Sequence, residues 1–122
     1  MPARVYRLAA PLLLGSAMAA QAVTLSTPVI QGKDVIACTV TNVGTRDATL
    51  VALEMFRLDG LPIPPQGPSC GATLAPRQSC IISTRGTSLY GFCQATGSGK
   101  LRLSVFGYIG NDVVVALPGT AN

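Results

Sequence analysis

The chain has 122 residues, with nine Lys or Arg against five Asp or Glu, which gives a formal charge of +4. It contains no histidine. This excludes Ser-His-Asp and Cys-His catalysis and removes the commonest metal ligand. A chain of this length forms one domain with a thin stability margin.

The N-terminal segment has the three parts of a secretory signal peptide. Arg4 and Arg7 give it a basic start, residues 8–20 are apolar, and small residues follow. We therefore expect a signal peptide at residues 1–22. The apolar run is shorter than the ~20 residues that a membrane span requires. We expect no membrane span after the signal is cleaved.

The mature chain is expected to be one domain, residues 23–122, secreted or periplasmic. Cleavage after Ala22 is favoured, and Ala19 or Ala20 are the alternatives. Removing two arginines with the signal leaves seven bases and five acids, a charge of +2. The seven bases are scattered singly, so we expect no nucleic-acid partner. They are Lys33, Arg46, Arg57, Arg77, Arg85, Lys100 and Arg102.

Seven β-rich runs follow one another along the mature chain, separated by Gly, Asp, Asn or Pro. They are residues 23–30, 35–43, 48–58, 80–84, 91–96, 100–109 and 112–117. Short runs at this spacing are typical of an all-β sandwich or barrel. The third run contains good helix formers, but its apolar side chains would fall all round a helix, so we expect a strand. The sequence predicts an antiparallel β-sandwich of about seven strands.

The mature chain has four cysteines: Cys38, Cys70, Cys80 and Cys93. An even number in a short exported chain predicts two disulfides, for which three connectivities exist. Alternation puts Cys38 and Cys93 on inward faces of an early and a late strand. In a two-sheet Greek-key sandwich such strands face each other, which predicts Cys38–Cys93 between the sheets and Cys70–Cys80 as a local link. The spacings do not fit zinc or a C-x-x-C redox site.

Several of these stretches together resemble a set of small exported bacterial proteins with an immunoglobulin-like β-sandwich and no established activity. Their pattern is C-x-V-x-N near the start, L-A-P-G before a strand, and a late Cys followed by an Arg-containing strand. The matching positions are Cys38, Val40, Asn42, Leu74, Ala75, Pro76, Cys93 and Arg102. Arg77 stands where the pattern has glycine, so we expect no φ > 0 at that position. The resemblance implies an immunoglobulin-like fold and an exported location, without a reaction.

The acidic residues do not predict catalysis. Asp34, Asp47, Asp59 and Asp112 lie in or beside turns, where aspartate caps its own backbone. Glu54 is the sole glutamate and is expected to face outward from a strand. A glycosidase needs two convergent carboxylates, which this pattern does not indicate. We expect no enzyme activity, no metal and no cofactor.

Two segments are candidates for recognition. The loop 60–70 contains four prolines and is expected to be stiff and exposed; its candidate residues are Pro62, Ile63, Pro64 and Pro65. The alternative is a plain crossover between sheets.

Tyr90 and Phe92 alternate with Gly91 and Cys93, so both should point outward. We expect a neighbouring loop to cover them, and the alternative is an exposed binding patch.

Taken together, the sequence predicts an exported, non-catalytic binding or structural module. Its partner would be an unknown protein or cell-surface component. The alternative is an inhibitor of a protease or another enzyme, presenting loop 60–70, because a rigid loop beside a disulfide lowers the entropy cost of binding.

Overall fold

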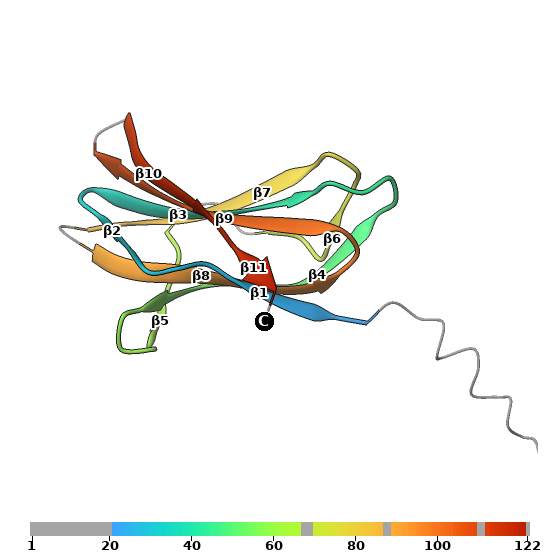
Figure 1. The fold of residues 1–122 in the computed structure, drawn as a ribbon, viewed down its shortest axis with the longest axis horizontal. Helices are drawn as coiled ribbons and strands as arrows, with labels where there is room; N and C mark the ends of the chain where they lie inside the picture. Colours follow the sequence, from blue (N-terminus) through green and yellow to red (C-terminus); the bar gives the residue numbers. More distant parts are fainter. Residues whose placement is uncertain (1–20, 67–69, 87–88, 110–111, 122) are drawn as a thin grey trace, which may run out of the picture.

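The structure is a computed structural model that describes residues 21–66, 70–86, 89–109 and 112–121. All but the last two residues of the expected signal peptide lie outside the described residues. Two antiparallel sheets pack face to face (Figure 1). The chain is therefore an all-β sandwich, as predicted.

The first sheet is built around two long central strands. Its order is β11 (Thr120–Ala121), β1 (Val23–Ser26), β8 (Leu89–Ser98), β4 (Ala48–Arg57) and β5 (Pro62–Ile63), with β2 (Ile30–Gly32) also pairing with β8 and β6 (Thr73–Leu74) with β4. The second sheet has the order β10 (Asp112–Pro118), β9 (Leu101–Ile109), β3 (Val35–Asn42) and β7 (Ser79–Arg85). Each of the seven predicted runs contains strand residues, and the third run is the strand β4 rather than a helix.

The first predicted run is divided into two strands, which corrects its expected length. β1 ends at Ser26 and β2 begins at Ile30. Pro28 has no N–H and cannot continue the ladder with β8. The buried Thr27 substitutes a side-chain bond: its Oγ1 accepts from the N–H of Cys93 at 2.9 Å. The interruption thus leaves both flanking strands paired with β8.

The core lies between the sheets and contains the predicted inter-sheet disulfide. Cys38 on β3 and Cys93 on β8 are fully buried, and their Cα atoms lie 5.8 Å apart. The largest buried apolar side chains around them are Ile36, Val40, Met55, Leu103 and Val105. The second disulfide joins Cys70 to Cys80, both only half-buried. The structure has both disulfides with the predicted connectivity.

Arg77 corrects one expectation drawn from the sequence. It was expected to avoid a positive φ, yet it adopts φ 68°. The N–H of Gln78 donates to the carbonyl of Ala75 at 3.0 Å, and φ > 0 after a proline is the geometry of a type II turn. The N–H of Arg77 also donates to the carbonyl of Asn42 at 2.8 Å. These bonds impose a conformation that glycine would adopt more easily.

The outermost strands carry features that limit pairing with another strand. By alternation, the backbone of Pro62 in β5 faces away from β4, where it has no N–H to donate. β10 has a register shift after Val113 and ends at Pro118. Along β7, Gln66 donates its N–H to the carbonyl of Ser83 at 2.8 Å. β11 is only two residues long. Bulges, prolines, covers and short strands are the usual protections of sheet edges.

Candidate binding surface

The hairpin between β4 and β5 forms one end of the sandwich. Its turn consists of Leu58, Asp59 and Gly60, with Gly60 at φ 87°. The N–H of Arg57 donates to the carbonyl of Leu61 at 2.7 Å, and the N–H of Gly60 donates back to the carbonyl of Arg57 at 2.9 Å. A glycine in the left-handed region is typical of three-residue hairpin loops. The turn is therefore closed by its own backbone.

Side chains also fix this turn. Arg57 Nη2 lies 2.9 Å from Asp59 Oδ2, and Asp59 Oδ1 accepts from the N–H of Leu61 at 3.2 Å. Both charged side chains are about half exposed, so the pair contributes only about 0.2–1 kcal/mol to stability. Its main effect is to hold Arg57 against the turn.

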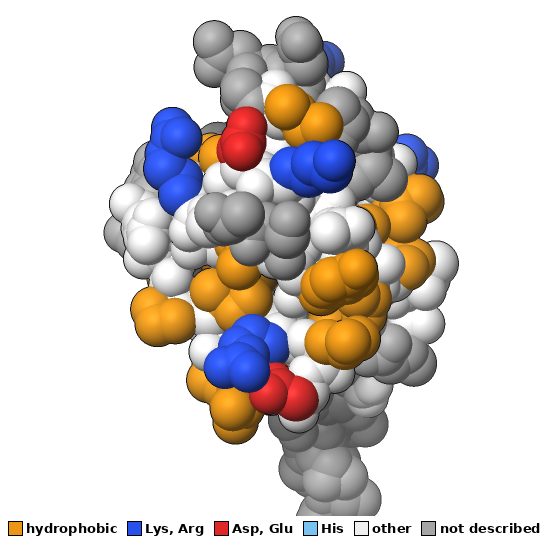
Figure 2. Space-filling model, turned by 90° about the vertical axis from the view of Figure 1, so that its left-hand side faces the viewer, with side chains coloured by type: hydrophobic (Ala, Val, Ile, Leu, Met, Phe, Trp, Pro, Cys, Tyr) orange, Lys and Arg blue, Asp and Glu red, His pale blue; other side chains and the backbone are white. Residues whose placement is uncertain are grey.

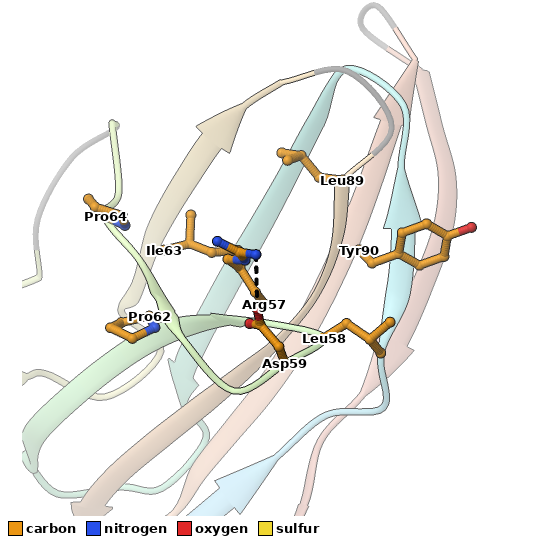
Figure 3. A pocket seen from close by; sticks show the side chains of 8 residues that line it. All are labelled: Arg57, Leu58, Asp59, Pro62, Ile63, Pro64, Leu89 and Tyr90. Carbon is orange, nitrogen blue, oxygen red and sulfur yellow. Dashed lines mark hydrogen bonds and ion pairs between the residues drawn. The ribbon is translucent and has the colours of Figure 1, made fainter.

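An apolar hollow of about 670 Å³ opens beside this hairpin (Figure 3). Leu58 extends toward the side of Tyr90, while Pro62 and Pro64 lie on the opposite side, with Arg57 between them. The complete lining is Arg57, Leu58, Asp59, Pro62, Ile63, Pro64, Leu89 and Tyr90. Most of these side chains are hydrophobic, and the two charged ones, Arg57 and Asp59, neutralise each other.

The surface around the hollow exposes large apolar side chains. Leu58 is 67% exposed, Leu61 54% and Tyr90 50%. Figure 2, which views this end of the molecule, shows hydrophobic side chains in several groups, with basic and acidic side chains between them. Exposed apolar groups that cluster around a concavity are typical of interaction sites. We name the hollow and its rim, including Leu61, the hairpin surface.

The structure unites parts of the two recognition candidates. Pro62, Ile63 and Pro64 line the hairpin surface together with Tyr90. Pro65 does not line this hollow. It lies beside two smaller hollows along β4, of about 310 and 190 Å³, and its three neighbours also line the second of these. The loop expected to be stiff and exposed contains the short strand β5 at this point.

The two aromatic residues differ in their surroundings. Phe92 is half-buried and stacks on Phe56, with ring centroids 5.5 Å apart. Tyr90 is half exposed, which contradicts the expected cover at that position. Leu58 and Leu89 were missed by the sequence reasoning. The Asp59-Gly60 pair is a hairpin signal that could have indicated the turn carrying Leu58.

The hairpin surface has few polar groups. Its polar groups are the Arg57–Asp59 pair and the Tyr90 hydroxyl. Across the described ranges, no group of three or more metal-binding side chains occurs. The hairpin surface is therefore an open apolar hollow, whose two charged side chains form an ion pair with each other.

Comparisons with known proteins identify no family. No protein-family model matches the chain, and no curated protein matches it either. It is distantly similar to the solved structure "Crystal Structure of Thermotoga maritima 1070", with 14% identity, a TM-score of 0.46, and coverage of 82% of this chain and 94% of that one. Within the described part of the chain, no helix has the length and apolar character needed to cross a membrane.

Proposed function

We propose that the protein is an exported, non-catalytic binding module that receives apolar side chains of a protein partner at the hairpin surface. The observation that carries this proposal is the exposed apolar hollow beside a turn fixed by backbone bonds and an ion pair. Preformed apolar concavities with a few polar groups are the usual form of binding sites. A rigid turn also loses little entropy when it binds.

The two disulfides support a location outside the cytoplasm, because disulfides persist in oxidising compartments. The expected signal peptide leads to the same compartment. The buried link between two sheets, from an early to a late strand, also supports the immunoglobulin-like character that the sequence resemblance implies. We propose a secreted or periplasmic protein of that architecture.

Side-chain contact is the mode of binding that the surface favours. Strand addition needs a free edge with backbone donors, and the outer strands carry a proline, a bulge, a covering residue or too few residues. The hairpin surface instead presents side chains from β4, β5 and β8. A partner would insert apolar groups between Leu58 and the prolines.

The inhibitor alternative requires loop 60–70 to stand free as a substrate-like segment. Pro62 and Ile63 instead pair with β4, and Gln66 is bound to β7. The side-chain Oε1 of Gln66 also accepts a hydrogen bond from the N–H of Arg85 at 3.3 Å. These bonds hold two parts of the loop against the sheets, so we favour the binding module.

Affinity capture with matched variants tests the proposal. Leu58 and Val51 are equally exposed, at 67%, and both belong to the β4 region, but only Leu58 lines the hollow. The full chain, Leu58→Asp and Val51→Asp would each be used to capture proteins from the exported fraction of producing cells. We expect a partner that Val51→Asp retains and Leu58→Asp loses at least tenfold. Equal retention or equal loss in the two variants would contradict the proposal.

A further inference from the structure

Four of the seven bases that are scattered in the sequence gather at the end of the sandwich opposite the hairpin surface. Arg46 lies in the turn between β3 and β4, Arg77 in the turn between β6 and β7, and Lys100 in the turn between β8 and β9. Arg102 follows at the start of β9, opposite Thr41 near the end of β3. Figure 1 shows these three turns at the same end of the molecule. We name these four side chains the cationic end.

A buried asparagine holds two of these turns in place. Asn42 is fully buried, and its Nδ2 donates to the carbonyls of Arg46 at 2.7 Å and Leu74 at 2.9 Å. Its Oδ1 accepts from the N–H of Gly44 at 2.9 Å. The side chain thus connects the turn that carries Arg46 to the strand that leads to Arg77.

Backbone bonds join the remaining turn to the same framework. The N–H of Val43 donates to the carbonyl of Lys100 at 2.8 Å, and the carbonyl of Asn42 accepts from the N–H of Arg77. Because these turns are mutually bonded, the backbone positions from which the cationic side chains extend keep a fixed arrangement. Preorganised charges lose less entropy on binding than those on free loops.

The charge of this end is not neutralised within the molecule. All four basic side chains are exposed, and among the described residues none of them forms an ion pair. Asp47 is the acidic residue in the same turns. At the opposite end, Arg57 is paired with Asp59, and the exposed Lys33 and Arg85 lie there together with Asp34. The cationic end, with four bases and Asp47, therefore carries more positive charge than the hairpin end.

A hollow of about 540 Å³ lies within the cationic end. It is lined by Gly44, Thr45, Arg46, Asp47, Thr49, Ser98, Gly99 and Lys100. Its two cations and three hydroxyl groups outnumber the one carboxylate, that of Asp47, and are suited to phosphate oxygens, which accept charge-assisted hydrogen bonds. Val43 directly precedes Gly44, a residue of this lining, and its side chain is 49% exposed.

The backbone of Arg77 supplies an independent observation. Its positive φ lowers the population of this backbone conformation about 5- to 30-fold for an L-residue relative to a right-handed one, and glycine would remove that strain. The strained residue nevertheless carries an exposed guanidinium. Strain of this kind occurs at functional positions, where the side chain has a use outside the fold.

We propose that the cationic end binds the phosphate groups of an anionic lipid surface, with the long axis of the sandwich directed away from that surface. Three of the cations lie on turns and the fourth at the start of β9, and Val43 is also exposed at this end, which suits a broad anionic interface better than an enclosed ligand. Each base near such a surface strengthens partition about fivefold, and salt weakens the effect.

Vesicle binding by the full chain, expressed with its own N-terminus and recovered in oxidised form, tests this proposal. The probes are vesicles of phosphatidylcholine alone and vesicles containing about a third phosphatidylglycerol. We expect binding only to the anionic vesicles. Arg46→Gln/Arg102→Gln should weaken it about 25-fold, since two charges are lost. The matched control Lys33→Gln/Arg85→Gln, at the other end, should change it less than twofold.

The variant Arg77→Gly distinguishes an effect of lost charge on binding from an effect of lost folding stability. It should weaken vesicle binding about fivefold while raising the thermal midpoint, because it removes a cation and relieves strain together. Absence of binding to anionic vesicles would overturn the proposal, as would an equal loss in the Lys33→Gln/Arg85→Gln control. Saturable binding of inorganic phosphate without vesicle binding would overturn the lipid assignment.

Discussion

Asn42 shows how one side chain can organise several loops. Its amide makes three hydrogen bonds, and its backbone makes two more, to Gln78 and Arg77. A buried amide of this kind is stabilising only while all its partners remain in place. The residue therefore links the core to the cationic end, although it carries no charge itself.

The substitution Asn42→Ala should destabilise the protein by about 3 kcal/mol, because it leaves the buried carbonyl of Leu74 and two part-buried backbone groups without their partner. Urea unfolding of the oxidised protein measures this loss. Thr41→Ala is the control: it removes an exposed hydrogen bond to Ser79 and should cost less than about 1 kcal/mol. Similar losses for the two variants would contradict the role given to Asn42.

At the residue scale, local pattern predicted some features and not others. The inward direction of Cys38 and Cys93 follows from strand alternation, which needs only neighbouring residues. The positive φ of Arg77 could not be found in this way, because bonds to Asn42 and within the turn impose it. The exposure of Tyr90 likewise depends on how far the β4–β5 hairpin reaches, which the sequence does not specify.

At the scale of elements, the long strands were predictable and the short ones were not. β3, β4, β8 and β9 have enough β-branched and alternating residues to be recognised. β5, β6 and β11 have two residues each, too few to show a period. β5 also contains a proline, which lowers strand propensity although it is tolerated at an edge. The hairpin surface was therefore only partly predictable, since it depends on β5.

The two disulfides should differ in their effect on stability. Replacing Cys38 and Cys93 by alanine should cost about 4 kcal/mol, and replacing Cys70 and Cys80 about 3 kcal/mol, from the loop lengths that each closes. The first pair also leaves a cavity in the core, which widens the difference. Urea unfolding of the two double variants measures both losses. A larger loss for the Cys70/Cys80 variant would contradict the assignment of Cys38–Cys93 as the main link.

At the scale of the whole molecule, the sandwich separates two kinds of surface. One end has the apolar hairpin surface with a neutralised ion pair, and the other has four exposed cations. The central strands are shared, but the turns at each end are independent of one another. Residues far apart in sequence come together at both ends, so neither surface was visible as a continuous motif.

Both proposed surfaces presuppose that the chain is an exported, oxidised sandwich. Peptide mapping without reduction, applied to the protein recovered from producing cells, tests this directly. We expect an N-terminal peptide beginning at Val23, linked peptides for Cys38–Cys93 and Cys70–Cys80, and no free thiol. A retained Met1, free cysteines, or a Cys38–Cys70 peptide would contradict the account.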